Sequence, residues 1–234
     1  MSDNANIANK SAARAGIDRR TVIAGGVGAL AAPAVLRVIP ANAQSKTIKI
    51  GHVSPKTGPL AGFGESDGFI IDQMNKILKP GLQSGGNTYQ VQIISKDSQS
   101  SGTRAAEVAA ELITRDKVDL IVASSAPDTT NPVADQAEVN EVPCVTTNCP
   151  WQPYFFGRNG DPKKGFTWTY HFFWGLEDVI ASYLPIWDGA PTNKIMGGLF
   201  PNDADGNAWG DPQRGLPPAL TKAGYKLLDP GRYQ

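Results

Sequence analysis

Hydrophobic and polar positions follow one another along this chain in a pattern that predicts strands alternating with helices. Residues 47–53 and 89–96 alternate apolar and polar side chains, and residues 118–123 form the near-continuous apolar run of a buried strand. Apolar residues recur at helical spacing in 65–79 and 103–116. This order predicts a doubly wound α/β domain built on a parallel sheet.

The pattern continues toward the C-terminus. Asn131 and Pro132 have the residue types of a helix N-cap and first helical position, so a helix is expected over 131–140, before a strand at 142–146. Residues 81–87 are expected to form a turn. A second α/β unit begins later, with helices and strands expected at 176–187, 193–200, 217–224 and 225–229. Two strands and two helices cannot easily cover a parallel sheet on both faces, so this unit is expected to be incomplete.

The first 43 residues are expected to be a targeting segment and not part of the fold. Arg19 and Arg20 precede a weakly hydrophobic run rich in Gly and Ala, and residues 41–43 have the small side chains of a cleavage site. Paired arginines in this position resemble a twin-arginine export signal, which predicts a periplasmic mature chain starting near residue 44. A short membrane anchor is the alternative, although the run is short and Gly-rich for a bilayer span.

Composition and charge narrow the function classes. Lys and Arg balance Asp and Glu at 22 each, and without a basic run or a metal-spaced Cys/His cluster we expect neither nucleic-acid nor metal binding. Cys144 and Cys149 could form a small-loop disulfide in an exported protein, or remain as one core thiol and one loop thiol. His52 and His171 are the only histidines, and no nucleophile–base pair stands out. We therefore expect a protein that is not an enzyme and holds no cofactor.

Short hydroxyl side chains gather in the loops that follow the predicted strands. These loops meet at the carboxyl edge of a parallel sheet, where ligands bind. Hydroxyl groups donate and accept hydrogen bonds, and with helix N-termini behind them they suit an anionic or zwitterionic small solute. Ordinary roles in turns and caps are the alternative. The candidate ligand-binding residues in these loops are Ser54, Thr57, Ser125, Thr129, Thr130, Thr147 and Asn148.

Aromatic residues are concentrated after the first domain. Ten of the 19 Phe, Tyr and Trp residues lie between Trp151 and Trp174. We expect these rings to divide between a core at a domain junction and the wall of a pocket for apolar or cationic parts of a ligand.

Taken in order, several stretches resemble the periplasmic solute-binding proteins of branched-chain amino acid and amide ABC transporters. They are IGHVSPKTGPLAGFGE (50–65), DS (97–98), TNPVAD (130–135), LFPNDADG (199–206) and GYKLLDPGRYQ (224–234). The resemblance implies two Rossmann-like lobes, with lobe 1 over 44–172 and the start of an incomplete lobe 2 over 173–234. It also implies a monomer that binds a small polar solute (an amino acid, amide or related carboxylate) between the lobes. This receptor would deliver the solute to an ABC permease in the inner membrane.

The resemblance further implies ligand contacts at 125–130, at Thr146 to Asn148, near Trp174, and near Asp203 and Asp205. Amino acid binders of the family typically have small residues where Cys149-Pro150-Trp151 stands, so Trp151 is expected to give the pocket an aromatic face. Family members are roughly twice as long as residues 44–234. A fragment, a truncated product or part of a split gene is therefore expected.

Two other functions stay open at this point. Gly62 and Gly64 follow the first strand, and Asp97 ends the second, where the ribose-binding acid of a dinucleotide-dependent oxidoreductase would lie. Gly68 is off the usual spacing of that motif. A non-functional remnant is the other possibility.

Overall fold

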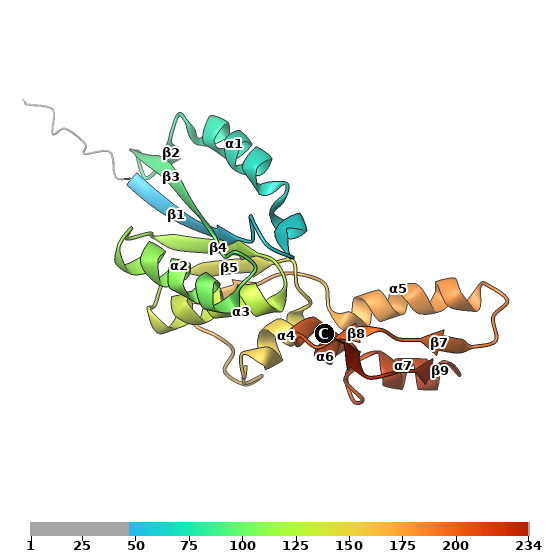
Figure 1. Cartoon of the computed structure of the whole chain (residues 1–234). Coiled ribbons are helices and arrows are strands. Elements are labelled where there is room, and N and C mark those ends of the chain that lie inside the picture. Colours follow the sequence, from blue (N-terminus) through green and yellow to red (C-terminus); the bar gives the residue numbers. More distant parts are fainter. Residues whose placement is uncertain (1–46, 234) are drawn as a thin grey trace, which may run out of the picture. The chain divides into compact units, whose positions relative to one another are not determined.

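The computed structural model describes residues 47–233, and the expected targeting segment 1–43 lies outside them. Strands and helices alternate through most of this range (Figure 1). The elements are β1 (Thr47–Ser54), the 3₁₀ helix η1 (Ala61–Gly64), α1 (Asp67–Leu78), β2 (Leu82–Ser84), β3 (Asn87–Asp97), α2 (Gly102–Thr114), β4 (Leu120–Ser124), α3 (Pro127–Val139), β5 (Cys144–Thr147), α4 (Trp151–Gly157), β6 (Thr169–His171), α5 (Leu176–Asp188), β7 (Ile195–Gly197), β8 (Phe200–Pro201), α6 (Ala204–Trp209), α7 (Leu216–Lys222), β9 (Lys226–Leu228) and β10 (Arg232–Tyr233).

A six-stranded sheet with the order β2-β3-β1-β4-β5-β6 organises the first part of the chain. Strands β3, β1, β4, β5 and β6 are parallel, and β2 pairs antiparallel with β3. The predicted parallel α/β sheet is therefore confirmed. The chain winds from β1 to β3 on one side and returns to β4 on the other, so β1 and β4 flank the switch point where doubly wound sheets bind ligands.

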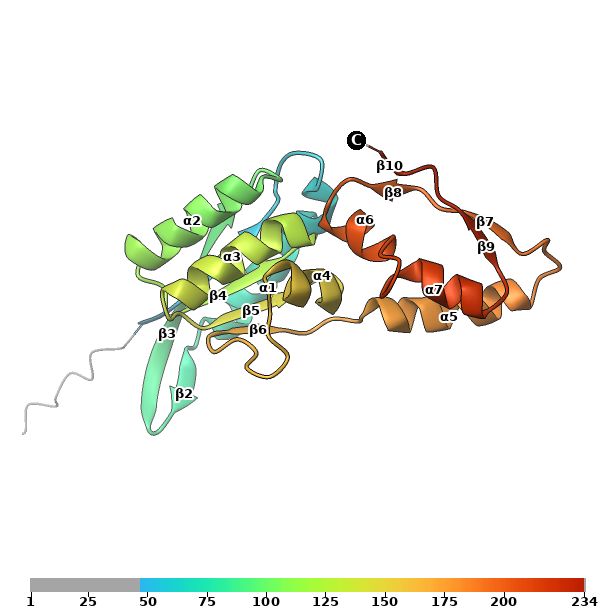
Figure 2. The ribbon, with the colours of Figure 1, turned by 90° about the horizontal axis from the view of Figure 1, so that it is seen from below.

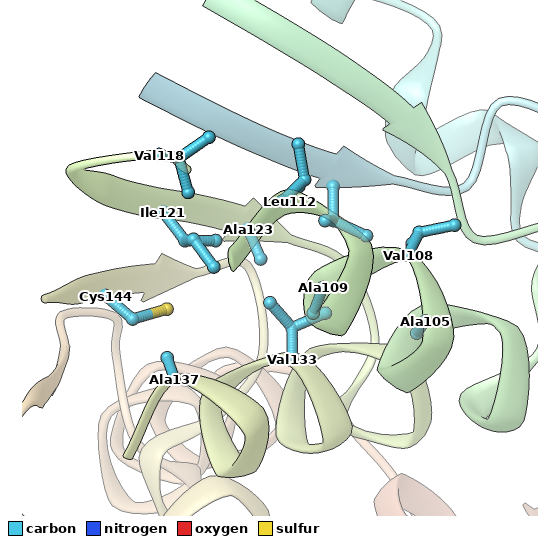
Figure 3. Close-up of a cluster of buried hydrophobic side chains, with 11 residues drawn as sticks. Ala105, Val108, Ala109, Leu112, Val118, Ile121, Ala123, Val133, Ala137 and Cys144 are labelled. Carbon is cyan, nitrogen blue, oxygen red and sulfur yellow. The ribbon is translucent and has the colours of Figure 1, made fainter. Parts of the chain in front are cut away.

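The main hydrophobic core lies between the sheet and helices α2 and α3 (Figure 3). Alternation along the strands sends Val53, Ile121 and Ala123 to this face, where they meet Leu112 and Val133. All five side chains are almost fully buried. Burying a side chain such as Leu112 stabilises a fold by roughly 1.5–3 kcal/mol. This core fixes the strand ends from which the ligand-side loops emerge.

Helix α1 lies on the opposite face of the sheet from α2 and α3 (Figure 1 and Figure 2). It is packed more loosely, because it buries one residue whereas α2 buries four. The predicted helix is present, but Phe69 and Ile77 of its apolar stripe are 70% and 69% exposed. Its one buried residue is Asp67, whose carboxylate lies 3.5 Å from Nε2 of His52. An apolar cavity of about 320 Å³ separates α1 from the sheet. The two faces of the sheet are thus unequally covered.

Residues 176–233 build a second, smaller core. Two short parallel pairs, β7 with β9 and β8 with β10, lie beside α5 and α7. The buried side chains of this core are Leu176, Ile180, Phe200, Leu216, Leu220 and Tyr225. No helix within residues 47–233 is both long and apolar enough to cross a membrane.

The predicted start of the third helix is wrong. Helix α3 begins at Pro127 with Ala126 as its N-cap, and Pro132 lies inside it. Pro127 already supplies the fixed φ that favours a first helical position, so the helix starts one turn earlier. Asn131 is not a cap; its side-chain amide donates to the carbonyl of Pro153, 3.1 Å away.

Several short elements also differ from the prediction. The turn expected over 81–87 contains β2, whose Leu82 pairs with Tyr89 of β3 to form a hairpin. The strand expected over 193–200 is divided into β7 and β8, which pair with different partners. Elements α4, β6 and α6 were not predicted, because each is too short to carry a periodic pattern.

Candidate functional site

An open cleft of about 730 Å³ lies where loops at the carboxyl edge of the sheet face the segment around β8 and α6. This is the place that the strand order indicates for a ligand. The sheet loops contribute Gly62, Phe63, Ser66, Asn148 and Pro150. The connecting segment adds Phe173 and Trp174, and the other wall consists of Leu199, Phe200, Pro201, Asp205, Gly206 and Trp209.

Aromatic side chains dominate the lining of this cleft. They come from the loop after β1, the connection between β6 and α5, strand β8 and helix α6, and they are Phe63, Phe173, Trp174, Phe200 and Trp209. The rings of Phe173 and Trp174 lie against each other with centroids 4.6 Å apart. Asp205 is the single ionisable side chain among the lining residues. The cleft therefore combines aromatic and apolar surface with one acidic group and the neutral polar side chains of Ser66 and Asn148.

Asp205 lies in the first turn of α6, close to two other carboxylates. The carboxylate of Asp203 caps the helix by accepting a 2.7 Å hydrogen bond from the N–H of Gly206. The carboxylate of Asp128, from α3, accepts a 3.3 Å hydrogen bond from the N–H of Ala204. Oδ1 of Asp205 is buried and has no hydrogen-bond partner within the part of the chain that the structure describes.

These surroundings change the acidity of Asp205. Burial raises its pKa to about 6, and the negative charges of Asp203 and Asp128 act in the same direction. Asp205 is therefore close to half-protonated at pH 6. Burial, together with the charge of Asp205, also raises the pKa of the Cys149 thiol to about 12.

The glycine-rich loop after β1 is held by Asp97. One carboxylate oxygen accepts from the N–H groups of Lys56 and Gln99, each at 2.8 Å, and the other accepts from the hydroxyl of Thr57 at 2.7 Å. Burial raises the pKa of Asp97, but hydrogen bonds from Gln99, Thr57 and Lys56 outweigh it and lower the pKa below its usual range. Both oxygens of Asp97 are thus engaged within the loop, which disfavours a ribose-binding role.

Glycine is required at two points of the same loop. Gly58 has a φ of +87°, and a Cβ there would lie 2.6 Å from Oγ of Ser100. A Cβ at Gly64 would lie 2.5 Å from the carbonyl oxygen of Pro55. This loop places Phe63 and Ser66 at the cleft. A side chain at either glycine position would shift the loop.

Four of the predicted hydroxyl residues, located between β4 and α3, in the first turn of α3 and in β5, are buried. Ser125, Thr129, Thr130 and Thr146 are at most 3% exposed. Thr130 donates to the carbonyl of Ser125 at 3.1 Å, and Thr129 donates to the carbonyl of Ala126 at 3.3 Å. These side chains hold the start of α3 in place.

His171 belongs to a structural network beside these hydroxyls. Its Nε2 lies 2.9 Å from the carbonyl oxygen of Cys149, which can only accept, so Nδ1 accepts from the hydroxyl of Thr146 at 2.9 Å. The ring stacks on Tyr154 with centroids 4.2 Å apart. Burial lowers the pKa of His171, in agreement with a neutral ring. Both ring nitrogens of His171 are therefore engaged within the fold.

The structure brings only some of the predicted site residues together. Asn148, Trp174 and Asp205 line the cleft. Thr147 lines the cavity under α1 and donates to the carbonyl of Phe172. Ser54 is buried at the end of β1. The remaining predicted residues have local partners: Thr57 binds Asp97, Trp151 donates to Glu177 at 2.7 Å, and Asp203 caps α6.

Sequence reasoning missed Phe63, Ser66, Phe200 and Trp209 as lining residues. Phe63 lies in the loop after β1, which contains the candidates Ser54 and Thr57. Its place in that loop could have indicated that it lines the cleft. Phe200 and Trp209 carried none, because the pairing of β8 and the existence of α6 decide which way this segment faces the sheet.

The two cysteines are free thiols, and both are fully buried. The disulfide considered from the sequence is therefore absent, and Cys149 lies in the loop between β5 and α4 with its thiol buried in a small core. Burial raises the pKa of the Cys144 thiol to about 12, as it does for Cys149.

Comparison with known proteins identifies the family. The sequence model for periplasmic binding proteins matches residues 47–234, so the chain belongs to the periplasmic binding protein family, as the sequence motifs predicted. The fold is that of a type I periplasmic binding protein. A search of curated proteins found no match.

Three solved structures illustrate the similarity. A solute-binding protein of an ABC transporter from Rhodopseudomonas palustris BisB5, in complex with 3,4-dihydroxybenzoic acid, is 20% identical with a TM-score of 0.60 over 78% of this chain. Another from R. palustris, in complex with 4-hydroxybenzoate, is 18% identical with a TM-score of 0.62 over 80%. The substrate-binding protein LivJ of Streptococcus pneumoniae, in complex with isoleucine, is 20% identical with a TM-score of 0.56 over 79%. The matches span 46%, 47% and 49% of these three proteins, about half of their length.

Proposed function

We propose that this protein is an extracytoplasmic solute-binding receptor that delivers a small polar solute to an ABC importer. The observation that carries the proposal is the cleft between the sheet loops and the β8–α6 segment, in a chain that belongs to the periplasmic binding protein family. The solute is an amino acid, an amide or a related carboxylate. The similar proteins with isoleucine and hydroxybenzoates bound support this range.

In this proposal Asn148, Trp174 and Asp205 contact the solute directly, because they line the cleft. The hydroxyls of Ser125, Thr129, Thr130 and Thr146 support the cleft from below its surface, since all four are buried. Thr129 and Thr130 donate to backbone carbonyls, and Thr146 donates to His171. Ser54, Thr57 and Thr147 help to fix the conformation of the neighbouring loops. Trp151 and Asp203 fasten the starts of α4 and α6.

The proposal also includes an organisation of the chain into a signal and two lobes. Residues 1–43 are an export signal of the twin-arginine type, residues 44–172 form lobe 1, and residues 173–234 belong to lobe 2. The partner is an ABC permease in the inner membrane, and the receptor acts as a monomer without a cofactor. Non-enzymatic binding is supported by the histidines, because both ring nitrogens of His171 are bonded and His52 contacts Ser95 and Asp67.

Two tryptophans in the cleft provide the test. Trp174 and Trp209 both line it, so a bound solute changes their fluorescence. The purified chain is titrated with leucine, isoleucine, short amides, urea and hydroxybenzoates while intrinsic fluorescence and the Tm are recorded. We expect one solute class to change the emission and to raise the Tm, because binding to the native state stabilises it by mass action.

Two matched tryptophan variants show whether the fluorescence change comes from the cleft. In Trp174→Phe the fluorescence change decreases, whereas in Trp187→Phe, a position outside the cleft lining, it is retained. A library in which no solute alters either the fluorescence or the Tm contradicts the proposed function.

A further inference from the structure

The acidic side chain in the cleft has no counter-charge close to it. Oδ1 of Asp205 is buried without a hydrogen-bond partner among residues 47–233. The cleft lining contains no Lys, Arg or His. The groups that act on Asp205 are Asp203 and Asp128, both negative, and the Cys149 thiol nearby is neutral because of its high pKa.

The backbone N–H groups at the start of α6 do not offset this negative charge. Those of Ala204 and Gly206 already donate to Asp128 and Asp203. The guanidinium of Arg232 lies over the ring of Phe200, a lining residue, with its carbon 5.2 Å from the centroid, and it pairs with Asp229 at 3.2 Å. Three carboxyl groups thus lie near one another at the start of α6, and that of Asp205 lines the cleft.

Five of the other lining residues of the cleft are aromatic, and the rest are uncharged. Ring faces carry negative potential and attract cations, most strongly when the cation is removed from water. A carboxylate beside several aromatic faces is the combination that binds ammonium groups and disfavours a second negative charge.

We propose, resting on the solute-receptor function above, that the cleft selects a solute with a protonated amine or quaternary ammonium on an apolar body. Asp205 is the carboxylate that pairs with the cation, and the rings of Phe173, Trp174 and Trp209 enclose the apolar part. Amino acids and amines fit this requirement through their ammonium group. Carboxylates without an amine do not.

Three probes of nearly equal size and different charge test the proposal. The full chain is titrated by calorimetry with benzylamine, benzamide and benzoate, which are positive, neutral and negative at pH 7.5. We expect benzylamine to bind most tightly and benzoate most weakly. In Asp205→Asn the affinity for benzylamine falls by about tenfold or more, as expected for a lost charge-assisted hydrogen bond, and the affinity for benzamide stays within about twofold. Asp72→Asn, an exposed carboxylate of α1, serves as the matched control.

The pH dependence gives a second readout. With a pKa near 6, only about a tenth of Asp205 is ionised at pH 5, whereas benzylamine remains protonated. We therefore expect benzylamine to bind about tenfold more weakly at pH 5 than at pH 7.5, and Asp205→Asn to remove this difference. A bound carboxylate that accepts a hydrogen bond from protonated Asp205 would show the opposite trend.

The outcomes separate this inference from the proposed function. If benzoate binds more tightly than benzylamine, or if Asp205→Asn leaves benzylamine binding unchanged, the cation inference is overturned while a solute receptor remains. If neither these probes nor the amino acids, amides and hydroxybenzoates bind, both fall. Thermal melts of each variant establish that a lost affinity does not come from unfolding.

Discussion

The carboxylate of Asp128 accepts a 3.3 Å hydrogen bond from the N–H of Ala204, the residue that precedes Asp205 in the chain. Asp128 lies in the first turn of α3, which follows β4 of the six-stranded sheet, and Ala204 begins α6. This contact joins the loop at the switch point of the sheet to the opposite wall of the cleft. It also brings a second negative charge to Asp205, which helps to raise the pKa of that group.

Asp128→Asn tests this coupling. The asparagine side chain can still accept from Ala204, so the geometry is kept while the charge is removed. We expect the pKa of Asp205 to fall from about 6 toward its usual range, because one like charge no longer opposes its ionisation. Carboxyl titration by NMR measures the change, with Asp72→Asn as the control. An unaltered titration of Asp205 would show that the charge of Asp128 does not contribute, and that burial and Asp203 set the pKa.

Asp205→Asn should alter the pH dependence of stability. The folded-state pKa of Asp205 lies above its unfolded value, so the folded protein binds the extra proton and is destabilised as the pH rises from about 4 to 6. Replacing the carboxyl removes this cost. We expect the free energy of unfolding to rise by about 2–3 kcal/mol at pH 7.5 and to change little below pH ~4.

Urea unfolding at pH 4 and pH 7.5 measures the effect of Asp205→Asn. A gain of similar size at both pH values would assign it to altered packing and not to the ionisation of Asp205. A loss of stability at pH 7.5 would contradict the raised pKa itself.

Asp97→Ala is expected to loosen the loop after β1. The carboxylate accepts hydrogen bonds from the N–H groups of Lys56 and Gln99 and from the hydroxyl of Thr57. Net contributions of about 0.5–1.5 kcal/mol per hydrogen bond, reduced by partial exposure, give an expected loss of about 1–2 kcal/mol. Urea unfolding measures the loss, and limited proteolysis reports cleavage near Lys56.

Asp72→Ala is the matched control for this loop, because Asp72 is an exposed carboxylate of α1. It is expected to change stability by less than about 0.5 kcal/mol and to leave the proteolysis pattern unchanged. Equal losses in the two variants would mean that Asp97 does not hold the loop.

The two thiols are expected to be inert in the folded protein. Cys144 and Cys149 are fully buried, and burial raises the pKa of each to about 12, so hardly any thiolate forms at pH 8. A thiol-reactive dye should label neither residue under native conditions and both in denaturant. Rapid native labelling of one thiol would place it at an opening in the fold. A mass two units lower after oxidation would identify a disulfide.

The fold could be predicted from the sequence wherever a pattern was long enough to be read. Strands β1, β3, β4 and β5 were recognisable because one face of each meets a core helix. Strand β6 was not, since its three residues lie in an aromatic stretch and are held to β5 through pairs such as Cys144 with Thr169. The bounds of α3 depended on which of two prolines starts the helix.

The candidate cleft could be predicted by region more readily than by residue. The carboxyl-edge rule points to the loops that border it, and Asn148, Trp174 and Asp205 are among its lining residues. Whether a hydroxyl faces solvent or a backbone carbonyl depends on tertiary contacts, as Thr130 shows by donating to Ser125. Likewise, the contribution of Trp209 depends on a short helix that Asp203 caps.

The uneven covering of the sheet has a consequence for motion. Helix α2 buries four residues against the core, whereas α1 buries only Asp67. Local opening costs least where little apolar surface is buried, so amide hydrogens of α1 should exchange with solvent well before those of α2. Helix α1 directly follows the segment that carries Phe63 and Ser66 into the cleft. Local opening of α1 would therefore reach the part of the cleft wall that Phe63 and Ser66 form.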